Sequence, residues 1–170
     1  SYTATVTASD GTNASTQNIS INILDVSDTA PVFTSSSTFS AAENQTSIGF
    51  VTTQDPDNDT VSYSLSGTDA SSMTIGSSSG VLAFSSAPDY ETKSSYSATV
   101  TASDGTNSST QNITVNVTNV NDNTPSITSS STFNAAENQT SIGTVTATDA
   151  DGDTLTYSLS GTDASSMTIG

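Results

Sequence analysis

The feature that most constrains the fold is an internal repeat with a period of 94 residues. The segment Ser1–Gly11 returns as Ser95–Gly105, and aligning 1–76 with 95–170 gives identity at 56 of 76 positions. Ser and Thr residues agree as well as apolar residues do, so packing alone does not explain the agreement, and tandem duplication is the simpler cause. The chain is therefore expected to fold as a row of similar units, each of which contacts only its neighbours.

Short runs of alternating apolar and polar residues recur within each unit, as in Tyr2–Ala8, Val61–Leu65 and Ile113–Val117. A period of two residues is typical of half-buried β-strands, and Thr suits the solvent face of a pleated strand. No sustained helical period occurs, so helices are not expected. The low apolar content and the net charge of −16 are also typical of disorder, but the ordered alternation favours a folded chain.

Unit length and strand spacing predict an all-β fold of Greek-key, seven-stranded β-sandwich repeats in a linear tandem array. The Asp-Gly pairs at Asp10 and Asp104 each separate two alternating runs and are expected to form tight turns. The apolar core is thin for 94 residues, so something besides apolar burial is expected to stiffen the chain. The strands expected in the complete unit are 32–39, 48–54, 61–67, 72–76, 81–84, 96–103 and 110–118. The expected core consists of Phe33, Phe39, Ile48, Val51, Tyr63, Leu65, Met73, Ile75, Leu82, Phe84, Tyr96, Val100, Ile113 and Val115.

The repeat divides the chain into three parts. Residues 1–30 match the C-terminal part of a unit, 31–124 form one complete unit, and 125–170 match the N-terminal part of the next. The chain is therefore expected to be a window on a continuous array, in which Ser1 and Gly170 are not natural termini. The alternative is that end pieces of different copies pair, with one copy donating strands to another.

The composition excludes several kinds of chemistry. The chain has no His, Cys or Trp, so it cannot form a Ser-His-Asp or Cys-His nucleophile, a thiolate zinc site or a disulfide. Its single basic residue, Lys93, offers no basic surface for nucleic acid. No apolar run approaches the roughly 18 residues that a membrane span needs, so no membrane insertion is expected in this segment.

The acidic residues gather in short motifs at fixed places in the unit. Two like charges ~4 Å apart repel by ~4 kcal/mol at an effective dielectric near ~20, so converging carboxylates need a counter-charge. Lys93 cannot supply one in every repeat, whereas a divalent cation can, and a set of Asp and Asn oxygens favours Ca²⁺. The motifs are Glu43-Asn44 and Glu137-Asn138, Asp55-Pro-Asp57-Asn-Asp59 and Asp149-Ala-Asp151-Gly-Asp153, Asp89-Tyr-Glu91, the loop residues Asp10 and Asp104, and the linkers Asp25-Val-Ser-Asp28 and Asn119-Val-Asn121-Asp122.

With these motifs the sequence resembles tandem cadherin-type repeats, in their bacterial cadherin-like form. Five motifs occur in the family's order: Glu-Asn, Asp-x-Asp, Asp-x-Glu, the loop Asp104, and the inter-repeat Asn121-Asp122-Asn123-x-Pro125. The resemblance covers the whole chain. It implies a cadherin or immunoglobulin-like sandwich, with Ca²⁺ ions between consecutive repeats held by ligands from both.

The resemblance also implies the ligands at the two junctions within the chain. In the second junction six carboxylates would be balanced by three Ca²⁺ ions. In the first junction Ser27 and Thr29 stand where the family usually has Asn. Asp69 and Asp163 fall outside the pattern and are expected to be plain surface residues. The implied ligands of the second junction are Glu43, Asp89, Glu91, Asn121, Asp122, Asp149 and Asp151, with the backbone of Val120 and Asn123 nearby, and those of the first are Asp25, Ser27, Asp28, Asp55, Asp57 and Asp104.

The function predicted from these observations is structural and not enzymatic. The chain is expected to be an extracellular, calcium-rigidified stalk or filament segment of a repetitive adhesin on the surface of a bacterial cell, with neighbouring repeats or copies of the same protein as partners. The alternative is an adhesion module for homophilic contact or for surface glycans. A glycoside hydrolase using Asp89 and Glu91 as paired carboxylates is improbable, because a catalytic site would then recur every 94 residues without a cleft.

Overall fold

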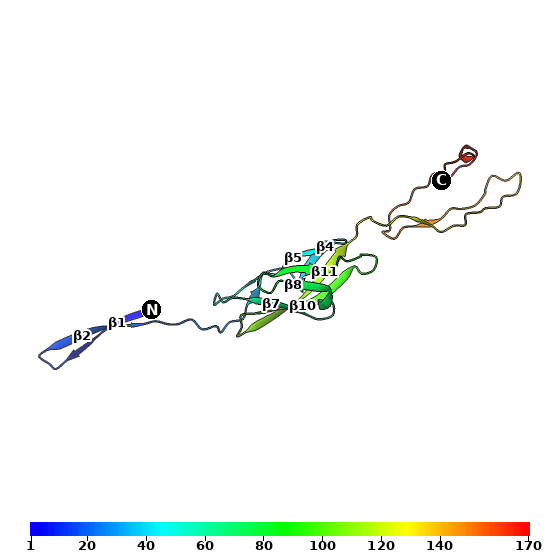
Figure 1. Cartoon of the computed structure of the whole chain (residues 1–170). Helices are drawn as coiled ribbons and strands as arrows, with labels where there is room; N and C mark the ends of the chain where they lie inside the picture. Colours follow the sequence, from blue (N-terminus) through cyan, green and yellow to red (C-terminus); the bar gives the residue numbers. More distant parts are fainter.

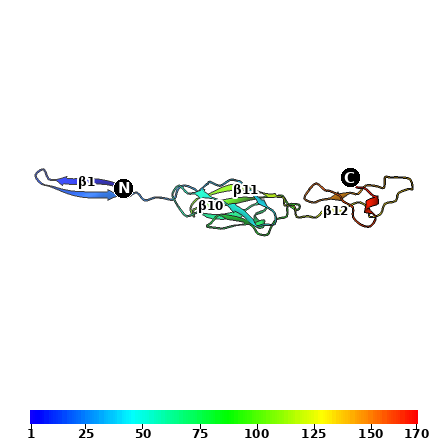
Figure 2. The same cartoon turned by 90° about the horizontal axis from the view of Figure 1, so that it is seen from above.

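The computed structural model describes all 170 residues and has three parts in a row (Figure 1). A β-hairpin at the N-terminal end is followed by a β-sandwich and then by a long C-terminal segment with few strands. Seen from above, the three parts remain in line (Figure 2). This arrangement agrees with the linear array that the internal repeat predicts.

The central part is a sandwich of two main sheets. The larger sheet has the strand order β4-β11-β10-β7, in which β4 and β11 run parallel and the other neighbours run antiparallel. The smaller sheet has the order β5-β9-β8, and a short antiparallel pair, β3-β6, completes this part. The strands are β3 (Val32–Phe33), β4 (Thr38–Ala42), β5 (Ser47–Phe50), β6 (Thr53–Gln54), β7 (Ser62–Ser66), β8 (Met73–Ile75), β9 (Val81–Phe84), β10 (Ser95–Ser103) and β11 (Ser108–Thr118).

Two of the seven predicted strands are divided in the structure. The strand expected at 32–39 is split into β3 and β4, which pair with different strands. The strand expected at 48–54 is split into β5 and β6, with a register shift between Ser47 and Gly49. Such changes of partner turn the corners of a sandwich, and the local sequence pattern does not reveal them because it carries no information about which strand each half pairs with. The other five strands lie within two residues of their predicted bounds, and Val81–Phe84 has the same bounds.

The core lies between the two main sheets and follows the predicted alternation. In β10, Ala98, Val100 and Ala102 are buried, whereas Thr99 and Thr101 face outward. Every residue of the expected core belongs to the buried cluster or packs against it. The cluster also contains Ala41, Ala98 and Val117, which are absent from the core predicted from the sequence. The two alanine side chains are small, and Val117 lies near the end of β11.

The two end parts have no sheet opposite them. The hairpin of β1 (Tyr2–Ser9) and β2 (Ala14–Ile21) leaves Tyr2 69 % and Val6 51 % exposed, although Val100, the repeat counterpart of Val6, is fully buried. A lone hairpin offers no second layer to cover its apolar face. In the C-terminal part only β12 (Ser126–Ile127) and β13 (Ala147–Thr148) form a ladder.

Helices are confined to two three-residue 3₁₀ turns, η1 (Ala70–Ser72) and η2 (Ala164–Ser166). Neither has the length or the apolar character that crossing a membrane would require. The prediction that the chain lacks helices therefore holds except for these turns, which lie 94 residues apart in the repeat.

Candidate metal centre between repeats

Glu43 anchors the C-terminal end of the sandwich. It follows β4 directly, and its side chain is only 3 % exposed. The backbone N–H of Tyr90 donates to Oε2 (2.7 Å), and the backbone N–H of Val120 donates to Oε1 (2.8 Å). A buried carboxylate needs such hydrogen-bond partners. Through them Glu43 fixes the loop before β10 and the linker after β11 to the end of the complete repeat, residues 31–124.

Four carboxylates converge beside this anchor. One oxygen from each of Glu43, Glu91, Asp122 and Asp151 lies within 4.8 Å of the others. They come from both sides of the linker, since Asp151 belongs to the next repeat. Lys93, the single basic residue, lies instead against Asp69. The repulsion among four carboxylates at such distances makes the cluster a place where a cation binds favourably.

Asp151 holds the linker to the second repeat. Its Oδ2 accepts hydrogen bonds from the backbone N–H groups of Asp122 (3.2 Å) and Asn123 (2.8 Å), and its Oδ1 accepts one from the Asn123 side chain (3.1 Å). The Asn119 side chain also donates to the Asp151 carbonyl oxygen (2.8 Å). These hydrogen bonds tie the linker to the acidic loop of the next repeat.

The pKa values of two cluster carboxyls shift in opposite directions. Partial desolvation, reinforced by the nearby charges of Glu43 and Asp151, raises the pKa of Glu91. Desolvation also acts on Asp151, but hydrogen bonds from the Asn123 backbone and side chain outweigh it and lower the pKa of that carboxyl. The carboxylate with the fewest donors is thus the one that gains most from a cation.

The other predicted residues of this junction lie near the cluster without joining it. Both oxygens of Asp89 are taken by Thr92, through its N–H (3.2 Å) and its hydroxyl (2.8 Å), and these bonds lower the pKa of Asp89. The Asn121 side chain donates to Asp153. Asp149 lies with Asp151 and Asp153 in a second acidic group of the same loop.

The first junction repeats the linker contact on a smaller scale. Asp57 Oδ2 accepts hydrogen bonds from the N–H groups of Asp28 (3.2 Å) and Thr29 (2.9 Å), as Asp151 does 94 residues later. The Thr29 hydroxyl donates to Asp28 (3.1 Å) but, unlike Asn123, makes no bond to the loop carboxylate. The exchange of Asn for Thr therefore removes one tie between linker and repeat.

The remaining predicted residues of the first junction form no carboxylate cluster. Asp104 Oδ1 closes the β10–β11 turn by accepting from the N–H groups of Thr106 (2.6 Å) and Asn107, and the Asn107 backbone bond is the main reason why the pKa of Asp104 is lowered. The Asn107 side chain reaches the linker at the Ser27 carbonyl oxygen (3.3 Å). Asp25, Asp28 and Asp104 belong to no group of three converging carboxylates.

The expectation that Asp69 is a plain surface residue is wrong. Its side chain is only 13 % exposed and forms an ion pair with Lys93, whose ammonium group also lies 4.7 Å from the centre of the Tyr96 ring. The Ser97 N–H donates to Asp69 Oδ2 (2.8 Å). This pairing joins the η1 turn to the start of β10, and no local motif signals it because the partners are 24 residues apart.

The Asp69 pair predicts a pH-dependent contribution to stability. The Lys93 ammonium group and then the Ser97 N–H hold the pKa of Asp69 below its ordinary 3.8. The contribution is therefore present above pH 3.8 and is lost as the pH falls through the lower folded-state pKa. We expect Asp69→Asn to cost about 1 kcal/mol in unfolding free energy at pH 7, with a difference from the parent that shrinks below pH 3.8. Denaturant unfolding at several pH values tests this, with Asp163→Asn as control, and a difference that is constant over pH would contradict it.

Three residues outside the predicted ligand set lie at the two junctions. The Asn44 side chain donates to Asp122, and its backbone has a positive φ of 63°. Asp59 and Asp153 are the third carboxylates of the two Asp-x-Asp-x-Asp loops. The spacing of the loop carboxylates is visible in the sequence, whereas the contact from Asn44 to Asp122, across 78 residues, is not.

The comparisons with known proteins support the same architecture. Residues 37–118 match the family model described as the Cadherin domain. Mouse protocadherin Fat 4 is 38 % identical over 122 residues, which is 66 % of this chain and 2 % of the relative. The protocadherin gammaB7 EC3-6 cis-dimer structure has a TM-score of 0.73 at 31 % identity, over 88 % of this chain and 43 % of that one. Mouse cadherin-23 EC22-24 also has a TM-score of 0.73, at 25 % identity, over 96 % of this chain and 58 % of that one.

The fold is thus that of tandem cadherin repeats, and the all-β sandwich prediction is confirmed. Cadherin domains are extracellular adhesion modules and not enzymes, in agreement with the non-enzymatic function predicted from the sequence. Fat 4 and cadherin-23 are mouse proteins, so the comparisons give no support to the bacterial form of the repeat. The chain spans about 2 % of the length of its Fat 4 relative.

Proposed function

We propose that the chain is a segment of an extracellular adhesion protein whose cadherin repeats are joined and stiffened by Ca²⁺ and contact other copies of the same protein. The observation that carries this proposal is the convergence of Glu43, Glu91, Asp122 and Asp151 across the linker. Their contributions from both repeats mean that a cation bound there would fix the angle between the two.

The donor set fits Ca²⁺. All the converging ligands are hard carboxylate oxygens, and the chain has no His or Cys to favour a softer metal. Two buried oxygens of the ligand set predicted for the first junction have no hydrogen-bond partner. They are Oδ2 of Asp55 and the hydroxyl oxygen of Ser27. Extracellular calcium modules bind at about 10⁻⁴–10⁻³ M. Bound Ca²⁺ would neutralise the junction, and Glu43 and Asp151 would keep their oxygens oriented toward it.

Contact between copies is the adhesive activity that the comparisons favour over a purely mechanical stalk. The gammaB7 relative forms a cis-dimer, and the proposal extends such self-association to this chain. A strong negative charge would keep copies apart unless Ca²⁺ reduced it at the junctions. The stiff array then has the secondary role of presenting the adhesive repeats away from the surface. The glycan partner considered from the sequence has no such support.

Aggregation of coated beads tests the proposed function. Beads carrying the 170-residue chain are expected to cluster in 2 mM CaCl₂ and to disperse in excess EDTA. Beads of a second colour that carry an unrelated, equally acidic protein serve as the control and should stay outside the clusters. Beads that bind Ca²⁺ but remain dispersed would reject homophilic contact and leave the stalk role. Beads that cluster equally in EDTA would reject the calcium dependence.

A further inference from the structure

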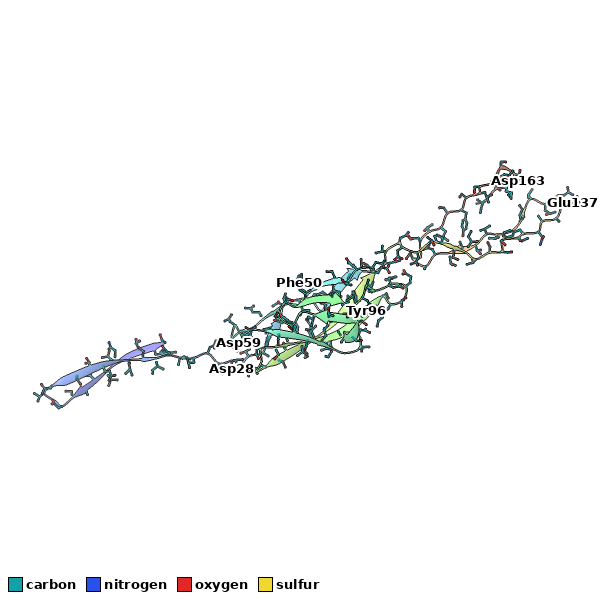
Figure 3. The ribbon with its side chains drawn as sticks, viewed as in Figure 1. Asp28, Phe50, Asp59, Tyr96, Glu137 and Asp163 are labelled. Atoms are coloured by element: carbon teal, nitrogen blue, oxygen red, sulfur yellow. The ribbon has the colours of Figure 1, made fainter.

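One outward face of the sandwich carries exposed apolar side chains. Phe50 of β5 is 63 % exposed, and its cross-strand partner in β9, Val81, is 41 % exposed. Val32 of β3 is 55 % exposed and pairs with Gln54 of β6. Phe50, Thr52 and Gln54 point to the same, outer side, because the residues between them are buried or half-buried. Figure 3 shows Phe50 on the outside of the sandwich. We call Val32, Phe50 and Val81 the outer patch.

The next repeat does not have the outer patch. Aligning 31–76 with 125–170 gives identity at 36 of 46 positions. Two of the ten differences fall on the outer patch, where Val32 is replaced by Ser126 and Phe50 by Thr144. The repeat thus accepts a hydroxyl residue at both places, so the fold of the unit does not account for the two apolar side chains. They distinguish the surface of the complete repeat from that of its neighbour.

The charges of the chain lie away from the strand faces. None of the 17 acidic residues belongs to a strand, and all of them lie in loops, turns and linkers. A second copy has the same net charge of −16, so two copies repel each other wherever their loops and linkers meet. A cationic partner would instead be attracted to the loops and would gain nothing at the outer patch. This charge distribution favours a second copy as the molecule that covers the patch.

The two sheets differ in what their outer faces offer. The larger sheet turns Ser and Thr side chains outward, as at Ser64 of β7 and at Thr99 and Thr101 of β10, and these keep their water. The smaller sheet has Phe50 and Val81 side by side in its outer face, and covering them releases water from apolar surface. Of the two uncharged faces, that of the smaller sheet is therefore the one that gains from contact.

The edge strand of the smaller sheet suits contact through side chains and not through added strands. In the order β5-β9-β8, β5 lies at the edge, and its ladder is interrupted by a register shift between Ser47 and Gly49. Bulges of this kind are one way in which proteins prevent edge strands from pairing with other chains. Phe50 lies just beyond the irregularity and remains available.

We infer that the outer patch is a contact surface for the same patch of a second copy. In a two-fold contact one surface meets itself, so a patch that is apolar and uncharged is its own complement. The Phe50 ring would lie against the Phe50 ring or the Val81 side chain of the other copy. A patch of three residues gives a weak contact, which many copies on one surface would strengthen through avidity. This inference rests on the proposed homophilic contact and states where on the sandwich it occurs.

Sedimentation equilibrium of the 170-residue chain in CaCl₂ tests the patch. Phe50→Thr, which introduces the residue that the next repeat has, is expected to raise the Kd of the dimer at least tenfold, because buried aromatic side chains dominate small interfaces. Leu24→Thr removes a side chain that is 81 % exposed in the linker and is the matched control. Its Kd should stay within threefold of the parent. Because Phe50 is exposed, an unchanged melting temperature shows that Phe50→Thr has folded.

Disulfide trapping is an independent test, since the chain has no cysteine of its own. Thr52→Cys places one thiol beside the outer patch, and Ser64→Cys places one on the outer face of the larger sheet. Both positions are exposed. Under mild oxidation in CaCl₂, Thr52→Cys is expected to form covalent dimers at least fivefold faster than Ser64→Cys.

The outcomes separate this inference from the proposed function. If the parent chain forms dimers and Phe50→Thr keeps its Kd within threefold, or if Ser64→Cys is trapped as fast as Thr52→Cys, the outer patch is rejected while homophilic contact stands. Loss of the dimer in Tyr2→Thr but not in Phe50→Thr would place the contact at the exposed hairpin and would also reject the patch. If the parent chain forms no dimers and its beads stay dispersed, homophilic contact itself is rejected.

Discussion

Removing Ca²⁺ is expected to lower the melting temperature of the chain by roughly 10 °C or more. A ligand at 100 times its Kd stabilises the folded state by about 2.7 kcal/mol for each site. For a domain of 60–100 residues, each 1 kcal/mol shifts the melting temperature by about 4–8 °C. Differential scanning calorimetry in 10 mM CaCl₂ and in EDTA measures the effect. Small-angle scattering of the Ca²⁺-free chain should also give a broader distribution of interatomic distances, because the junction carboxylates then repel one another.

Asp122→Ala is expected to reproduce much of the EDTA effect. Its carboxylate is the linker's contribution to the cluster, and it also receives the Asn44 side chain. The suitable control is Asp163→Ala, because Asp69 is engaged by Lys93 and its replacement would destabilise the sandwich for another reason. Identical melting and scattering profiles with and without Ca²⁺ would contradict the proposed metal centre.

The sequence predicts the strands better than it predicts how they join into sheets. The short apolar run Val81–Phe84, bounded by Gly80 and Ser85, locates β9 at its observed bounds. The sequence prediction merges β3 with β4, because the polar segment 34–37 gives no local sign that the pairing partner changes. Which strand each half pairs with depends on the whole sandwich and not on the local pattern.

The same distinction applies to the candidate site. Glu43, Glu91, Asp122 and Asp151 were expected together because family resemblance carries information about distant contacts that spacing alone lacks. The resemblance places Asp89 with them, but its two oxygens instead accept local hydrogen bonds from the N–H and the hydroxyl of Thr92. The pairing of Lys93 with Asp69 depends on tertiary packing, and neither residue lies in a motif.

Leu82→Ala is expected to cost about 2–5 kcal/mol in unfolding free energy. Leu82 is 1 % exposed and lies in β9, the middle strand of the smaller sheet, opposite Gly49 on one side and Ile75 on the other. Gly49 has no side chain to move into the space that the truncation would leave. A loss of this size is a large part of the about 5–15 kcal/mol that stabilises a typical domain.

Val81→Ala, one residue away, is the matched control for this cavity. Val81 is 41 % exposed and points to the opposite face of β9, so its truncation should cost less than about 1 kcal/mol. Guanidinium denaturation of both variants in saturating CaCl₂ and again in EDTA separates the packing term from the metal term. The difference between the variants should persist in both solutions, because the core and the junction are distinct sources of stability. A larger loss for Val81 than for Leu82 would mean that β9 is in the opposite register, and with it the assignment of every inward residue in the smaller sheet would be reversed.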